Sequence, residues 1–163
     1  GFFMDTILKL LKHNARLSAD ELASMTGLSV PEVEQKIKSY EKKGIIMGYS
    51  AILNDELIED DDNVTAYVEV KITPEKNAGY DAIAKTIAKY DEVESVTLMS
   101  GSYDLAVTIS GSNVRKISMF ISQRLSTIDG VLSTATHFIL KRYKDKGICI
   151  DQDATDERGF VAP

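Results

Sequence analysis

Two copies of one helix-start signal lie close together near the beginning of the chain, as Ser18-Ala-Asp-Glu21 and Ser29-Val-Pro-Glu32. In such a capping box the serine hydroxyl accepts the backbone N–H three residues later, and the glutamate accepts the serine N–H. Only a short turn containing Gly27 separates the two predicted helices. Because helices joined by so short a turn cross at a steep angle, the stretch Ser18–Tyr49 predicts a helix-turn-helix.

The flanking residues extend this unit. Apolar residues at helical spacing predict a preceding helix between Met4 and Asn14, and Lys42-Lys43-Gly44 carries the signals of a helix end. Ile45–Leu53 then predicts a strand, as one arm of a wing. The expected inward residues are Leu22, Ala23 and Met25 of the second helix and Val33, Ile37 and Tyr40 of the third. An ordinary helical hairpin within a core is the alternative, because a single Ser-x-x-Glu box is common.

Charge is distributed unevenly along a chain whose net charge is −6. Residues 1–50 are nearly neutral, with seven Lys or Arg and six Asp or Glu, whereas residues 51–62 hold six acids and no base. The acidic segment cannot bury a core and repels phosphate, so it predicts a solvated linker. Cys149 is the only cysteine, which excludes a disulfide framework and favours a reducing cytoplasm. No apolar run is long enough to span a membrane, and no secretory signal is evident.

The second half predicts a βαββαβ order, the ferredoxin-like arrangement. The expected elements are strands at Val64–Thr73, Val93–Met99, Leu105–Ile109 and Leu132–Tyr143, with helices at Glu75–Tyr90 and Val114–Ile128. Both helices then cover one face of the sheet. The other face, expected to include Ala106 and Ile139, is most economically covered by a second copy, so we expect a homodimer.

These patterns predict an α+β chain with four parts. They are a winged helix-turn-helix at residues 1–50, an acidic linker with a strand at 51–63, a ferredoxin-like domain at 64–146, and a polar tail at 147–163 that forms a loop or a late helix.

The third predicted helix is the candidate reader of base edges, because recognition helices enter the major groove near their N-termini. Gln35 suits adenine, whereas Lys36 and Lys38 suit phosphate or guanine. The full candidate set for DNA binding is Arg16, Ser29, Val30, Glu34, Gln35, Lys36, Lys38, Ser39 and Lys42. The alternative is that these residues form an ordinary solvated face, and a carboxylate such as Glu34 is repelled by phosphate.

Gly101-Ser-Tyr-Asp104 is the candidate ligand-binding turn. A glycine-led turn can direct consecutive N–H groups at a carboxylate, and Asp104 supplies the opposite charge for an α-ammonium group. Thr134 and Thr136 offer hydroxyl groups. The alternative is a plain hairpin turn that Asp104 caps.

Signals for catalysis or metal binding are weak. His13 and His137 lie on different predicted domains, with no partnered nucleophile, and Cys149 lacks the companion spacing of a metal site. The acidic residues 59–62 lack the glycine and terminal glutamate of a calcium loop. We therefore expect no catalytic residue, no metal and no cofactor.

The order and spacing of these motifs resemble the Lrp/AsnC family of transcription regulators. The resemblance spans residues 5–145 and rests on Ile7-Leu-x-x-Leu11, Asn14-Ala-Arg16, Glu21-Leu-Ala23, Gly27-Leu-Ser29, Val33, Lys36-Ile37, Glu41, Gly44-Ile-Ile-x-Gly-Tyr49, Val93-x-x-Val96, Gly101-Ser-Tyr-Asp104, Gly130-Val131 and Thr134-Ala-Thr136. The family joins a winged helix-turn-helix to a ferredoxin-like domain that senses amino acids between dimers. The resemblance therefore implies an effector site formed by Gly101, Ser102, Tyr103, Asp104, Thr134 and Thr136.

Two departures concern the third helix. Gln35, Lys36 and Ser39 stand where the family usually has arginines, and Tyr40 stands where leucine is usual. Lysine contacts phosphate but lacks the planar fork that reads guanine.

The leading interpretation is a cytoplasmic, amino-acid-responsive regulator that binds double-stranded DNA as dimers assembling into tetramers or octamers. Two alternatives stay open. One is an enzyme resembling the haem-pathway decarboxylases, which needs His13 and His137 to converge, and the other is a metabolite-binding protein that has lost its DNA affinity.

Overall fold

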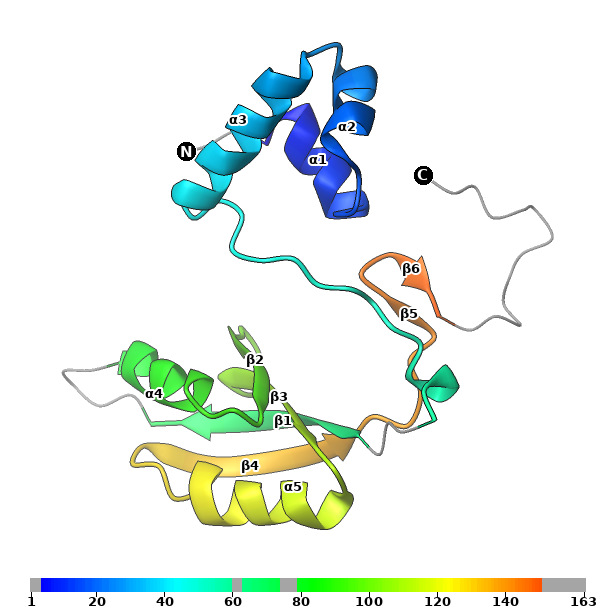
Figure 1. Ribbon diagram of the computed structural model, residues 1–163. Coiled ribbons are helices and arrows are strands. Elements are labelled where there is room, and N and C mark those ends of the chain that lie inside the picture. The colour runs from blue at the N-terminus through cyan, green and yellow to red at the C-terminus, as the bar shows by residue number, and fades with distance from the viewer. Residues whose placement is uncertain (1–3, 60–62, 74–78, 151–163) are drawn as a thin grey trace. The chain divides into compact units, whose positions relative to one another are not determined.

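The computed structural model describes residues 4–59, 63–73 and 79–150, in two units (Figure 1). The first unit comprises the chain up to Leu53 together with the segment from Asp145, and the second comprises Asn54–Lys144.

Three helices form the first unit: α1 (Thr6–His13), α2 (Ala19–Thr26) and α3 (Val30–Lys42). Both predicted capping boxes are confirmed, with the Ser18 hydroxyl accepting the Glu21 N–H at 3.1 Å and the Ser29 hydroxyl accepting the Glu32 N–H at 3.3 Å. Gly27 ends α2 with a φ of 75°, in the left-handed region that favours glycine. The short turn between two strong helix starts is what makes α2 and α3 cross.

A small apolar core joins the three helices. Its buried members are Ile7, Leu11, Leu22, Val33 and Tyr40, with the half-buried Ile37 and Ala23 packed against them. The prediction that Met25 points inward is wrong, because its side chain is 50% exposed. Met25 lies in the last turn of α2, where the chain is about to leave the helix at Gly27.

The predicted strand at Ile45–Leu53 is also wrong, and with it the strand expected in the linker. The N–H groups of Ile45 and Ile46 both donate to the Tyr40 carbonyl, at 2.9 and 3.2 Å, so they close the end of α3. A strand also needs a paired neighbour, and none adjoins this segment in the described residues. The described part of the linker forms a 3₁₀ turn, η1 (Asp55–Leu57).

A four-stranded antiparallel sheet with two helices forms the second unit, and the predicted βαββαβ order is confirmed. Its elements are β1 (Val64–Ile72), α4 (Gly79–Ala88), β2 (Val93–Leu98), β3 (Leu105–Gly111), α5 (Val114–Phe120), the π-helical turn η2 (Ile121–Leu125) and β4 (Val131–Phe138). The strand order is β2-β3-β1-β4, so β1 and β3 are central and β2 and β4 are edges.

The ends of several elements differ from those predicted. β4 stops at Phe138 rather than Tyr143: its last pair with β1 is Phe138 with Ala66, and the Ile139 N–H still donates to the Thr65 carbonyl at 2.9 Å. Because β1 begins at Val64, it has no residue that could pair with Tyr143. The helix predicted at Val114–Ile128 consists of α5 and the π-helical turn η2, and it ends at Leu125. The helix predicted at Glu75–Tyr90 is α4, which ends at Ala88. Residues 75–78 of the predicted helix lie outside the described residues.

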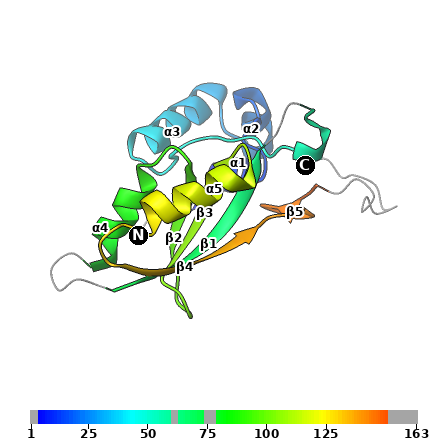
Figure 2. The ribbon, with the colours of Figure 1, turned by 90° about the horizontal axis from the view of Figure 1, so that it is seen from below.

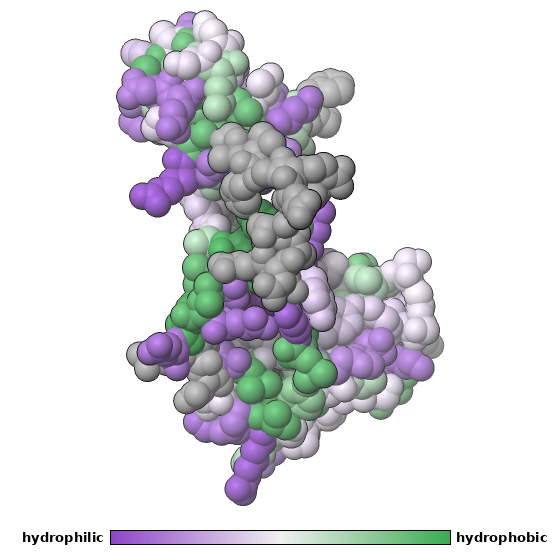
Figure 3. All heavy atoms as spheres, turned by 90° about the vertical axis from the view of Figure 1, so that its right-hand side faces the viewer, coloured by the Kyte–Doolittle hydropathy of each residue, from purple (hydrophilic) through white to green (hydrophobic). Residues whose placement is uncertain are grey.

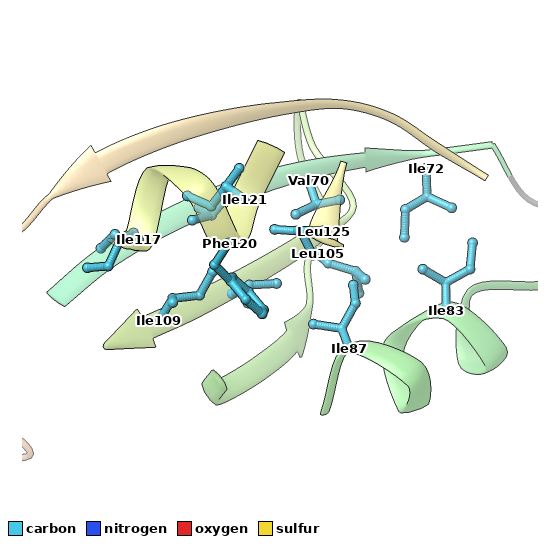
Figure 4. Packing of buried hydrophobic residues seen from close by; sticks show 13 residues of the cluster. Val70, Ile72, Ile83, Ile87, Leu105, Ile109, Ile117, Phe120, Ile121 and Leu125 are labelled. Atoms are coloured by element: carbon cyan, nitrogen blue, oxygen red, sulfur yellow. The ribbon is translucent and has the colours of Figure 1, made fainter. Parts of the chain in front are cut away.

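Alternating apolar residues of β1 and β3 all face α4 and α5 (Figure 2), because side chains along a strand alternate between the faces of the sheet. Figure 4 shows this core. The strands pack against Ile83 and Ile87 of α4, Ile117 and Phe120 of α5, and Leu125 of η2.

The opposite face of the sheet is more polar. Tyr67 and Glu69 of β1 lie there beside His137 and Ala135 of β4, and Ala106 of β3 pairs with Glu69. Large apolar side chains are also exposed at the chain's surface, among them Leu53, Leu57, Leu132, Leu140 and Tyr143. In Figure 3, exposed hydrophobic residues appear as green patches between hydrophilic residues in purple.

A two-stranded ribbon follows the sheet where a polar tail was predicted. It consists of β5 (Lys144–Asp145) and β6 (Ile148–Cys149), joined by Lys146 and Gly147. The rest of the predicted tail, from residue 151, lies outside the described residues. Among the helices of the described residues, none is both long and apolar enough to cross a membrane.

Candidate functional site

The exposed side of α3 carries most of the residues predicted to contact DNA. Val33, Ile37 and Tyr40 face the core, so a helix of this pitch directs the side chains of Gln35, Lys38 and Lys42 away from it. Gln35, Lys38, Lys42 and also Glu34 are exposed, and Ser39 is half-buried. The structure therefore brings an amide, a hydroxyl and two ammonium groups onto one helical surface.

The start of α3 and the loop before α2 hold three of the remaining four candidates. Ser29 caps α3 with its hydroxyl, and Val30, its first residue, is half-buried. Arg16 is exposed, and its N–H donates to the Asn14 side-chain oxygen at 3.0 Å, which fixes the loop that carries it.

Lys36 lies apart from the helical surface formed by Gln35, Lys38, Ser39 and Lys42. Its ammonium is 3.5 Å from a carboxylate oxygen of Asp5, the N-cap of α1. The same oxygen accepts a hydrogen bond from the Tyr40 hydroxyl. Asp5 thus links the start of α1 to the middle of α3, a role that the sequence analysis missed. Its signals were an aspartate just before an apolar helical run, and a tyrosine at the position where leucine is usual.

These contacts shift the pKa of both partners. Burial raises the pKa of the Asp5 carboxyl, but hydrogen bonds from Tyr40 and Leu8 and the charge of Lys36 lower it further, so it lies below the ordinary 3.8. Burial and the Asp5 carboxylate together raise the pKa of Tyr40 to about 12.

Asp5→Asn is expected to remove a pH-dependent part of the stability of the first unit. Because the carboxyl has a lower pKa in the folded chain, its contribution is fully present above the unfolded pKa of 3.8 and is lost as pH falls through the folded value. Urea unfolding followed by helical circular dichroism at pH 7 and pH 3 should show the variant less stable at pH 7, with a smaller deficit at pH 3. Asp20→Asn, at an exposed position of α2, is the control. An equal deficit at both pH values would contradict this role for Asp5.

The predicted ligand-binding turn joins β2 to β3. Asp104 is anchored to β1, since its N–H donates to the Val70 carbonyl at 3.0 Å and its carboxylate accepts the Ile72 N–H at 2.8 Å. One carboxylate oxygen is thus engaged with the backbone, while Gly101 and Ser102 are exposed. The turn offers a fixed negative charge beside an open backbone.

Thr134 and Thr136 do not join this turn within one chain. They pair with Val70 and Val68, so they lie on the helix-covered face of β4, an edge strand separated from β3 by β1. Both are half-buried, and the Thr134 hydroxyl is 3.5 Å from that of Ser126.

Tyr103 instead reaches the open face of the sheet. Its hydroxyl is 2.5 Å from that of Tyr67, a hydrogen bond that, with burial, raises the pKa of Tyr67 to about 12. His137 lies on the same face, 3.6 Å from the Glu69 carboxylate. The described residues contain no cluster of three or more His, Cys, Asp or Glu that could hold a metal ion.

Comparisons with known proteins agree with this arrangement. Residues 65–148 match the family described as the Lrp/AsnC ligand binding domain, and residues 6–47 match the family described as winged helix-turn-helix DNA-binding. The chain is 42% identical to YugG, an HTH-type transcriptional regulator of Bacillus subtilis, over 96% of this chain and 95% of that protein.

Solved structures show the same fold. A transcriptional regulator from Neisseria meningitidis, in complex with L-methionine, has a TM-score of 0.67 and 27% identity, covering 88% of this chain and 94% of that one. The feast or famine regulatory protein of Mycobacterium tuberculosis, also complexed with L-methionine, has a TM-score of 0.68 and 25% identity, covering 89% and 95%.

Proposed function

This chain belongs to the Lrp/AsnC family of transcription regulators, and from that premise we propose that it binds specific DNA sequences through α3 and that an amino acid alters this binding. The observation that carries the DNA-binding role is the pair of capping boxes, which set α3 across α2 with Gln35, Lys38 and Lys42 exposed. Ser39 and the start of the helix, at Ser29 and Val30, complete the surface.

Each side chain has a role in this proposal. Gln35 reads a base edge, whereas Lys38, Lys42 and Arg16 neutralise phosphates. Lys36 shares its charge between Asp5 and the DNA. Glu34 lies at the edge of the surface and disfavours phosphate there. With so few net positive charges per copy, several copies bound together supply the affinity.

Gln35→Ala is expected to lower affinity for the preferred sequence by about 1–3 kcal/mol and to relax discrimination at one base pair. The measurement is fluorescence anisotropy of the full chain on a duplex from the region upstream of its own gene, and on duplexes with single base-pair changes. Gln123→Ala makes the same chemical change at an exposed position of the second unit and should have no effect. Unchanged discrimination in the Gln35 variant would remove that residue from the reading surface, and no binding by the unchanged chain at low salt would contradict DNA binding itself.

We propose that the effector is an amino acid held at the Gly101–Asp104 turn. Support comes from the fixed carboxylate of Asp104, which suits an α-ammonium group, and from the two similar regulators crystallised with L-methionine. Because Thr134 and Thr136 lie on another strand, the proposal requires them to be contributed by a second copy. A thermal-shift screen of the twenty amino acids, beginning with methionine, identifies the effector.

We also propose that the parts predicted from sequence act as modules, with residues 1–50 and 64–146 joined by the linker 51–63 and followed by the tail 147–163. The division of the chain into two units supports the separation of residues 1–50 from residues 64–146, although it groups residues 54–63 of the linker with the second unit and the tail with the first. In our proposal the sheet's open face is covered by a second copy, and dimers assemble into tetramers or octamers in the cytoplasm. The similar regulators favour this function over the haem-pathway enzyme and over a metabolite-binding protein without DNA affinity.

A further inference from the structure

A groove of about 750 Å³ in the first unit joins Arg16 to basic side chains that the proposed reading surface of α3 does not use. Its basic lining residues are Lys12, His13, Arg16 and Lys146, and we call this groove the basic groove. No acidic residue lines it in the part of the chain that the structure describes, although the chain has 25 Asp and Glu. Within the described residues, Lys12, Arg16 and Lys146 form no ion pair with a carboxylate. The groove is therefore a local positive site on an acidic protein.

Three separate segments build this groove. Lys12 and His13 come from the end of α1, Arg16 from the loop before α2, and Lys146 from the β5–β6 ribbon, which groups with the first unit. The Asn14 side chain holds the Arg16 N–H, so the loop is fixed rather than loosely attached. A cleft lined by one sign of charge raises the local concentration of a ligand of opposite charge, and here three separate segments supply that charge.

Lys146 has an unusual backbone for its residue type. Its φ is 46° and that of Gly147 is 85°, the pair of positive angles that a type I′ hairpin turn requires. Lysine adopts positive φ uncommonly, and glycine or asparagine would relieve the strain. The ribbon thus presents an exposed ammonium at its tip despite a less favourable backbone. Residues held in such uncommon backbone conformations cluster at binding and active sites.

We propose that the basic groove binds the phosphate backbone of DNA beside the segment that α3 reads. Arg16 lies two residues before Ser18, the N-cap of α2, and in a helix-turn-helix the first helix crosses the DNA backbone. The groove is therefore adjacent to the part of the motif that meets phosphates. This inference rests on the proposed DNA binding and adds contacts that carry no sequence information but extend the footprint along the duplex.

The experiment compares the full chain with the double variant Lys12→Gln/Lys146→Gln on two duplexes. One duplex holds only the segment protected by α3, and the other carries additional flanking base pairs on both sides. Affinity is measured by fluorescence anisotropy between 50 and 300 mM salt. Lys85→Gln/Lys89→Gln removes the same charge from exposed positions in the second unit and serves as the matched control.

On the long duplex, the slope of log affinity against log salt should be about two units less negative for the double variant than for the unchanged chain, because each phosphate contact contributes about −0.9. Its slope on the short duplex and its discrimination between sequences should equal those of the control. An unchanged slope on the long duplex, in a chain whose binding still responds to Gln35→Ala, overturns the basic groove and leaves the proposed function standing. Failure of the unchanged chain to bind either duplex overturns both.

A pyrophosphate titration of the DNA-free protein separates DNA from a small phosphorylated ligand. Weak binding, at millimolar pyrophosphate, agrees with a surface built for a duplex. Micromolar binding that the double variant loses, together with an unchanged salt slope on DNA, overturns the DNA assignment and identifies a free phosphate-bearing ligand as the occupant.

Discussion

Leu22→Ala is expected to unfold the first unit and abolish DNA binding, while the second unit stays folded and still binds its effector. Leu22 is 0% exposed and is one of five buried residues that form that core among the described residues. Removing such a side chain costs about 2–5 kcal/mol. A unit of this size is stable by roughly 3–8 kcal/mol, so most of its stability disappears. Urea unfolding monitored by circular dichroism, with DNA and amino-acid binding measured in parallel, records the outcome.

Ile87→Ala is the matched variant for this prediction. Ile87 is also 0% exposed, but it belongs to α4 and packs in the core of the second unit. It should weaken the effector-binding unit and leave the helix-turn-helix folded. Met47→Ala, at a side chain that is 87% exposed, should affect neither unit. If Leu22→Ala and Ile87→Ala shift one common transition by similar amounts, the units do not unfold separately and the modular proposal is wrong.

Local chemistry explains why much of the fold was predictable. The capping boxes at Ser18 and Ser29 satisfy backbone donors with side chains only three residues away, so the sequence contains both partners. The alternation of Val68 and Val70 with Tyr67 and Glu69 likewise assigns faces of β1 without knowledge of its neighbours. Both predictions depend on short stretches of chain.

Errors arose where the outcome depends on a distant or absent partner. Ile45 and Ile46 have strand-forming side chains, but their N–H groups bond to the end of α3, and no paired strand competes for them in the described residues. The apolar pattern of the last strand continues to Tyr143, but β1 begins at Val64 and offers no residue opposite Tyr143. Periodicity reports the preference of a segment and does not report what lies beside it.

The candidate sites show the same division. The exposed residues of α3 follow from helical pitch alone. The ion pair between Asp5 and Lys36 joins residues 31 positions apart, and the basic groove joins Lys12 to Lys146, so neither follows from local spacing. The effector residues were grouped by family resemblance, whereas strand order places Thr134 and the turn on separate parts of the sheet.

Asp104 illustrates how one residue can satisfy both interpretations of its turn. One carboxylate oxygen accepts the Ile72 N–H at 2.8 Å, as the plain structural interpretation expected. The negative charge nevertheless remains, and a carboxylate can accept further hydrogen bonds at its other oxygen. The structural contact would therefore hold the charge in place for a ligand's ammonium group, and the two roles can be separated by substitution.

Asp104→Asn is expected to reduce amino-acid affinity by about 10- to 150-fold while leaving the second unit folded. The amide oxygen can still accept the Ile72 N–H, but the charge-assisted bond to the α-ammonium, worth about 1.5–3 kcal/mol, is lost. Calorimetric titration with the amino acid identified by thermal shift measures the affinity, and urea unfolding measures the stability. Asp129→Asn, an equal change of charge at an exposed position of the same unit, should alter neither.

Asp104→Ala distinguishes the charge from the backbone anchor. Besides losing the ligand's partner, it leaves the Ile72 N–H without its acceptor, which costs about 1–3 kcal/mol of stability. Loss of affinity in both variants, with loss of stability only in the alanine variant, is the pattern that an effector-binding aspartate produces. If the asparagine variant binds the amino acid as tightly as the unchanged chain, Asp104 serves only to fix the turn, and the ammonium must be held elsewhere.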